Sequence, residues 1–317
     1  MMMQNIKKKR MISIVAILIT LVLIGGFVGL YFLAVSIYDG SFNYRCTTAE
    51  DIAFDISEFP TMTRQRHTFV SNNGQKLVGY LYEQDNVENK AVVVFAHGLG
   101  AGGQTGYMDI FNYLTAQGYY VFAYDATAND ESEGNVIGGL PQGFIDLDYA
   151  IDYVYTIEQI RDLPMVLMGY SWGGLSVANV LNYHPEVKAV TTLAGWNKSM
   201  NLIEYRGCQM VGGVAKLLLP FASIYEYTMY GEYAFSTAMK GFKNSDCKVM
   251  VVHGELDDTI PIEYGYETYY KEHGTDERFI FKIYADRDHE LMRNADGVHD
   301  LLLMQEIVDF FDGSLVN

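Results

Sequence analysis

The sequence contains little cysteine. Its 317 residues include three, Cys46, Cys208 and Cys247, and no two of them have CxxC spacing. This spacing gives no support for a zinc site or a thioredoxin-type redox motif, and an odd number of cysteines cannot all pair as disulfides. We expect free structural thiols; a single disulfide remains the alternative if the chain folds in an oxidising compartment.

Basic residues are also scarce. The chain has 22 Lys and Arg against 39 Asp and Glu, which gives a formal net charge of −17. Binding to nucleic acid depends on a basic surface that neutralises phosphates, so this composition argues against a nucleic-acid partner. Half of the residues are hydrophobic, which is enough for a sizeable core. We find no repeat with a fixed period.

One long stretch near the N-terminus has no charge at all. Residues 11–38 form this run of 28, and a helix needs about 20 apolar residues to cross a bilayer. Signal peptides have apolar cores of about 7–15 residues, so an uncleaved anchor is favoured over cleavage near residues 34–36. Lys7 to Arg10 precede the run, and basic residues beside a membrane helix stay cytoplasmic. We predict a single-pass cell-membrane protein with a cytoplasmic N-terminus and an extracytoplasmic body.

The rest of the chain alternates between β-rich runs and helical patterns. Strands are expected at 65–70, 76–82, 91–96, 119–124, 165–170, 188–193, 248–253 and 278–284. Helices are expected at 105–117, 144–159, 172–183, 264–272 and 298–311. Such alternation predicts an α/β fold with a mostly parallel sheet of eight strands and helices on both faces.

The segment 197–245 departs from this alternation. It is long for a connection between two strands and is rich in aromatic and aliphatic residues. We interpret it as a helical lid, with an extra packing helix as the alternative. The predicted organisation is a basic cytoplasmic segment at 1–10, a transmembrane helix at 11–38, a linker at 39–62, and one domain at 63–317 with the lid inserted.

A serine stands in a tight turn after the fifth predicted strand. Residues 169–173 have the pattern G-x-S-x-G between a strand and a helix. Such a turn needs small residues on both sides and raises the serine hydroxyl above the sheet. We predict that Ser171 is a nucleophile; the alternative is a structural turn serine.

Backbone N–H groups near this serine are candidates for an oxyanion hole. The N–H of Trp172 belongs to the start of the helix, where donors face outward. A second donor is expected in the loop after the third strand, where Leu99 follows His97 and Gly98. We therefore predict Leu99 and Trp172 as donors. His97 precedes the serine in the chain, and we interpret it as a residue that fixes the loop.

A serine nucleophile needs a base, and the base needs an orienting carboxylate. With this kind of serine turn, the order along the chain is serine, acid, histidine. Asp257 follows the seventh predicted strand, with Asp258 as its rival, and His289 follows the eighth. The predicted triad is therefore Ser171, Asp257 and His289.

These residues, in this order, resemble the α/β-hydrolase superfamily, and within it the bacterial serine aminopeptidases and monoacylglycerol-lipase-like esterases. The resemblance covers about residues 65–312 and implies an α/β-hydrolase fold with a lid, here behind a membrane anchor. Members carry a stretch like D-x-R-G-x-G-x-S after the fourth strand. Asp125 and Ser132 match it, but Thr127, Ala128 and Asp130 replace the arginine and both glycines. These three replacements bear on which substrate is bound, and they leave the predicted triad unchanged.

The resemblance and the motifs together predict a serine hydrolase of the carboxylesterase or lipase type that needs no metal or cofactor. The apolar lid indicates a small-molecule ester with an apolar acyl group, or a lipid-like ester. Three alternatives stay open: an acyltransferase, a non-catalytic anchored binding protein, and an aminopeptidase. An aminopeptidase would bind a free amine, and Glu204, Glu226 and Glu232 in the lid are candidates for that. The sequence leaves the oligomeric state open.

Overall fold

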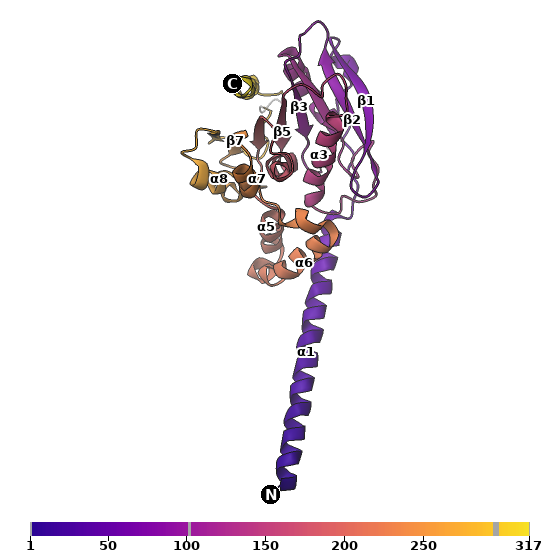
Figure 1. Ribbon diagram of the computed structural model, residues 1–317, viewed down its shortest axis with the longest axis vertical. Coiled ribbons are helices and arrows are strands. Elements are labelled where there is room, and N and C mark those ends of the chain that lie inside the picture. The colour runs from indigo at the N-terminus through magenta and orange to yellow at the C-terminus, as the bar shows by residue number, and fades with distance from the viewer. Residues whose placement is uncertain (1, 101–102, 294–297, 317) are drawn as a thin grey trace.

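The computed structural model describes residues 2–100, 103–293 and 298–316. A long N-terminal helix leads into a body in which helices cover both faces of one sheet (Figure 1). Two clusters of buried side chains lie on the two faces. One contains Leu147 and Val177, and the other contains Phe111 and Phe311.

The sheet has eight strands in the order β1-β2-β4-β3-β5-β6-β7-β8. They are β1 (Met62–Val70), β2 (Lys76–Gln84), β3 (Ala91–Ala96), β4 (Tyr119–Tyr124), β5 (Met165–Tyr170), β6 (Ala189–Leu193), β7 (Lys248–Gly254) and β8 (Phe279–Tyr284). Strand β2 pairs antiparallel with β1 and β4, and the other neighbours are parallel. The predicted sheet is confirmed; the largest difference in a strand end is at β1, which begins three residues early.

Nine α-helices lie in the described part of the chain. They are α1 (Met2–Phe42), α2 (Met108–Ala116), α3 (Pro141–Val154), α4 (Trp172–Asn179), α5 (Ser199–Val211), α6 (Leu219–Tyr230), α7 (Ala238–Asn244), α8 (Tyr266–His273) and α9 (Leu301–Leu315). Helix α3 was expected at 144–159. It begins earlier because Pro141 suits the first helical turn. It ends earlier because the chain closes into turns, where the Thr156 hydroxyl donates to the Tyr153 carbonyl oxygen at 2.7 Å.

The segment expected to be a lid contains three helices. Helices α5 and α6 and the turn between them, Gly212–Leu217, stand at one end of the body beside α1 (Figure 1). Helix α7 differs from them, since Ala238 and Phe242 are fully buried within the core on the α4 side of the sheet.

Helix α1 leaves the body as a single rod (Figure 1). Its segment Lys9–Phe42 is long and apolar enough to cross a membrane, a criterion that a signal sequence also meets. The helix continues four residues beyond the expected end of the span. Its last turns pack on the body, where Ala34, Tyr38 and Phe42 are buried.

Candidate active site

Ser171 occupies a strained turn between β5 and α4. Its backbone has φ +55° and ψ −113°, in a region that side chains other than glycine rarely adopt. Glycine is needed on both sides. A Cβ on Gly169 would lie 2.1 Å from the carbonyl oxygen of Gly173, and one on Gly173 would lie 1.8 Å from that of Ala96. The G-x-S-x-G pattern therefore reflects a close approach of three backbone segments.

The three residues predicted to form a triad lie together. The Oγ of Ser171 is 2.9 Å from Nε2 of His289, and Nδ1 of His289 is 2.8 Å from Oδ2 of Asp257. They follow β5, β8 and β7, strands whose carboxyl ends meet at one edge of the sheet. A proton on Nδ1 leaves Nε2 free to accept the serine hydroxyl, which is the arrangement that a general base requires.

Four donors surround the carboxylate of Asp257. Its Oδ1 accepts the N–H groups of Thr259 at 2.9 Å and Ile260 at 2.8 Å. Its Oδ2 faces His289 and, at 3.2 Å, Nε2 of His253. Burial raises the pKa of Asp257, but the hydrogen bonds from the two histidines and from Ile260 outweigh it. The net pKa lies below its ordinary value, so the carboxylate is ionised at neutral pH.

His253 is a further side chain beside Asp257, and the sequence pattern did not single it out. It is fully buried, and its Nε2 donates to the Ile260 carbonyl oxygen at 2.9 Å while facing Asp257. Its Nδ1 has no hydrogen-bond partner among the described residues. The available signal was its place at the end of β7, four residues before Asp257. The rival Asp258 is exposed and lies outside this network.

The loop after β3 is fixed by His97. Its Nδ1 donates to the carbonyl oxygen of Gly98 at 2.7 Å, and its Nε2 accepts the N–H of Ala126 at 3.0 Å. Burial lowers the pKa of His97, which keeps the ring neutral and suited to these two roles. The next residue, Leu99, lines the cavity above Ser171.

The second expected oxyanion donor begins a helix. Trp172 is the first residue of α4, where N–H groups have no partner within the helix. Its indole Nε1 donates to the Leu140 carbonyl oxygen at 2.8 Å, which holds the start of α4 against the chain before α3.

The loop after β4 has an unusual backbone at two residues that are not glycine. Ala128 has φ +60° and Asp130 has φ +34°, both in the region that favours glycine. Asp130 compensates through its side chain, which accepts the N–H groups of Thr48 at 2.6 Å and Gly103 at 2.9 Å. These bonds join the loop to the chain before β1 and to the chain between β3 and α2.

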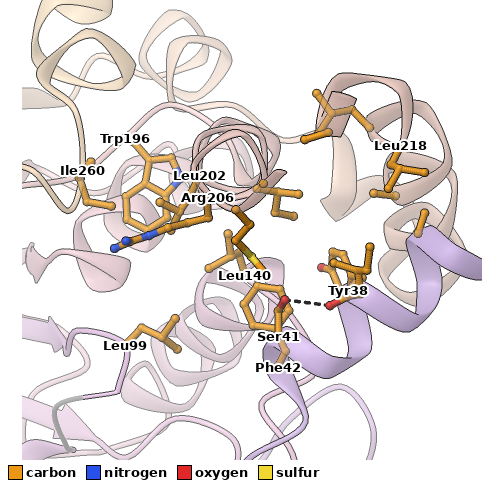
Figure 2. A pocket seen from close by; sticks show the side chains of 18 of the residues that line it. Tyr38, Ser41, Phe42, Leu99, Leu140, Trp196, Leu202, Arg206, Leu218 and Ile260 are labelled. Carbon is orange, nitrogen blue, oxygen red and sulfur yellow. Dashed lines mark hydrogen bonds between the residues drawn. The ribbon is translucent and has the colours of Figure 1, made fainter. Parts of the chain in front are cut away.

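A cavity of about 540 Å³ opens above Ser171 and His289. Helices α5 and α6 form one wall, and the last turns of α1 form another (Figure 2). From α1 come Ala34, Ile37, Tyr38, Ser41 and Phe42; from the lid come Leu202, Ile203, Met210, Leu218 and Ala222, among others. The walls are mainly apolar, and among the described residues that line them Arg206 is the only Lys, Arg, Asp or Glu.

The acidic lid residues do not face this cavity in the part of the chain that the structure describes. Glu204 forms an ion pair with Lys216 at 2.9 Å. Glu226 is buried and accepts hydrogen bonds from Tyr38 and Ser199.

Comparisons with known proteins identify the fold. Residues 87–222, less than half of the chain, match the model of a family described as serine aminopeptidase, S33. An esterase from Pyrococcus furiosus is 14% identical with a TM-score of 0.64, over 86% of this chain and 99% of that one. An acylaminoacyl peptidase from Pyrococcus horikoshii is 18% identical with a TM-score of 0.61, over 82% of this chain and 43% of that one.

Acetyl xylan esterase 1 from a Thermoanaerobacterium species is 14% identical with a TM-score of 0.56, over 86% of this chain and 97% of that one. A search of curated proteins gives no match. At such identities the solved structures establish the fold. The chain has the α/β-hydrolase fold, which it shares with these esterases and this peptidase.

Proposed function

We propose that the protein is a serine esterase, of the carboxylesterase or lipase type, that cleaves esters with an apolar acyl group. The observation that carries this proposal is the chain of hydrogen bonds from Ser171 through His289 to Asp257 at the floor of an apolar cavity. The strained backbone of Ser171 adds support, because strain of this kind is retained where it serves a function.

The mechanism would be a two-step acyl transfer. Ser171 Oγ attacks the ester carbonyl carbon while His289 Nε2 takes its proton, and Asp257 stabilises the resulting imidazolium. The N–H groups of Leu99 and Trp172 would bind the oxyanion. The tetrahedral intermediate then expels the alcohol, which receives the proton from His289. Water, activated by the same histidine, attacks the acyl-enzyme and releases the carboxylic acid.

The cavity favours an ester over a peptide with a free amino terminus. An aminopeptidase needs an acidic group near the amine, and Glu204 and Glu226 are engaged with other partners. The apolar walls match an acyl chain, since apolar surface removed from water contributes about 25 cal/mol per Å².

We also propose that α1 anchors the enzyme. In this arrangement residues 1–10 are cytoplasmic, 11–38 cross the membrane, 39–62 connect, and 63–317 form the extracytoplasmic hydrolase domain with its lid at about 197–245. Protease added to intact cells should then degrade the body. Survival of the body until the cells are lysed would contradict this topology.

Substrate selectivity tests the proposed reaction. We would compare the full-length protein with Ser171→Ala on soluble esters of increasing acyl length and on aminoacyl anilides. We expect ester hydrolysis that rises with acyl length, little anilide cleavage, and no turnover by the variant. Faster cleavage of anilides would favour a peptidase, and acyl transfer to an added alcohol in place of acid release would favour an acyltransferase.

A further inference from the structure

A bilayer that α1 spans must extend along α1 as far as the start of the lid helix α6. A membrane span takes about 20 residues, and every window of that length within the charge-free residues 11–38 includes residues 19–30. Phe27 therefore lies within the hydrocarbon layer for any placement of α1 as a span. Its ring centroid is 6.0 Å from that of Phe221 in α6. The contact places the start of α6 beside a part of α1 that is surrounded by lipid.

The surface of the lid is mostly apolar, as contact with the hydrocarbon layer requires. Exposed apolar side chains gather on α5, α6 and the turn between them: Met210, Val211, Val214, Leu217, Ile224 and Met229. Lid segments Ser199–Leu217 and Leu219–Asn244, bent by 97°, are together as apolar as a broken membrane span. Two exposed charges interrupt this surface. Lys216 pairs with Glu204 and has a stem long enough to reach the headgroups, and Arg206 of α5 is exposed and also lines the cavity.

The cavity lies between this surface and α1. One wall belongs to the last turns of α1, the other to α5 and α6, and Figure 2 shows Tyr38 and Phe42 across the cavity from Leu202. An acyl chain that moves from the bilayer into this space would exchange one apolar environment for another without crossing water.

We propose that α5, α6 and their connecting turn are immersed in the leaflet on the side of the body, and that the cavity takes the acyl chain of a membrane lipid ester directly from that leaflet. The immersion follows from the contact of α1 with α6 and from the apolar surface of the lid. The identity of the substrate as a lipid ester rests, in addition, on the esterase function proposed above.

Immersion is testable without any enzymatic activity. The full-length protein, with Cys208→Ala to remove its half-buried thiol, would carry Leu217→Cys or, as a control, Leu302→Cys on α9. Both leucines are exposed, by 66% and 80%. After labelling with a polarity-sensitive fluorophore and reconstitution in phosphatidylcholine vesicles, nitroxide on the acyl chains should quench the label at 217, and aqueous iodide should quench the label at 302.

Two results would overturn the immersion. Quenching of the label at 217 by iodide would place the lid in water. Shielding from both quenchers would mean that a protein partner covers the lid.

Activity then tests delivery of the substrate. We expect Leu217→Glu to lower hydrolysis of a long-chain lipid ester in vesicles by about tenfold or more, because a charge in hydrocarbon is costly. Hydrolysis of a soluble short-chain ester should not change, and Leu302→Glu should affect neither substrate. Equal activity of Leu217→Glu and wild type on the vesicle substrate would contradict delivery from the leaflet. If wild type cleaves no ester at all, the esterase proposal fails, while the quenching result still decides the immersion.

Discussion

The hydroxyl of Tyr38 in α1 donates a hydrogen bond of 2.7 Å to Oε1 of Glu226 in α6. Both side chains are buried, and the Ser199 hydroxyl of α5 donates to the same oxygen. Tyr225 adds a second link, since its hydroxyl donates to Asp39 at 2.7 Å. The N-terminal helix is therefore joined to both lid helices through polar groups, in addition to the wall that it supplies to the cavity.

Removing this hydroxyl should loosen the lid. Tyr38→Phe leaves a buried carboxylate oxygen with one donor fewer, at a cost of about 1–3 kcal/mol. We expect faster amide hydrogen exchange in α5 and α6 and little change in the central strands. Tyr31→Phe is the matched control on the same helix, because no hydrogen bond of Tyr31 is found among the described residues. Equal exchange in the two variants would show that the link does not hold the lid.

The two adjacent aspartates should differ sharply in their effect on catalysis. Asp257→Asn replaces the acceptor that orients His289 with a group that can favour the wrong tautomer, and kcat should fall by about 10⁴-fold. Asp258→Asn changes an exposed side chain, and we expect a change within about twofold. Steady-state ester hydrolysis measures both. A larger loss in Asp258→Asn than in Asp257→Asn would mean that the acid has been assigned to the wrong residue.

A pH-dependent contribution to stability is expected from Asp125. Burial raises the pKa of this carboxyl to about 7, well above its ordinary value. The folded protein therefore binds a proton that the unfolded chain releases between about pH 4 and 7, so stability falls as pH rises through this window and levels off above it. Asp125→Asn should remove this part of the decline, as measured by thermal unfolding at pH 5 and pH 8. An unchanged difference between the two pH values would exclude Asp125 as its source.

The positive φ of Ala128 should lower the stability of the folded protein. Glycine at a left-handed position avoids a conformational cost of about 1–2 kcal/mol. Any buried Ala→Gly change also lowers the free energy of unfolding, because a buried methyl group is lost and the unfolded chain gains entropy. Ala126→Gly should show only the loss of the methyl group and the gain in unfolded-state entropy, because Ala126 is buried and has no positive φ. We expect Ala128→Gly to be more stable than Ala126→Gly by about 1–2 kcal/mol in thermal or chemical unfolding. Equal stabilities would refute the strain.

The sequence predicted most of the sheet because its central strands are continuous apolar runs bounded by turns. The order of motifs along those strands also led to the prediction of Ser171, Asp257 and His289 as a triad, and the structure places His289 within hydrogen-bond distance of the other two side chains. The α1–lid contact could not be predicted in the same way. Tyr38 and Glu226 are 188 positions apart, and no local pattern marks them as partners.

The loop after β4 shows a second limit of the sequence. Nothing in the sequence marked Ala128 and Asp130 as residues with positive φ, and at Asp130 side-chain hydrogen bonds to Thr48 and Gly103 support this conformation. The contribution of His253 was hidden for a similar reason. A histidine beside a glycine at a strand end gives no sign that its ring will face the carboxylate four residues on.

The most direct test of the central claim is labelling with a fluorophosphonate, which reacts only with an activated serine. The full-length wild type in membranes should be labelled, and Ser171→Ala should not. Ser176→Ala is the matched control, since this serine lies in α4, the helix that directly follows Ser171, is buried, and donates to the Trp172 carbonyl oxygen; it should be labelled like wild type. Labelling that survives in Ser171→Ala, or a folded wild type that is not labelled, would contradict the account.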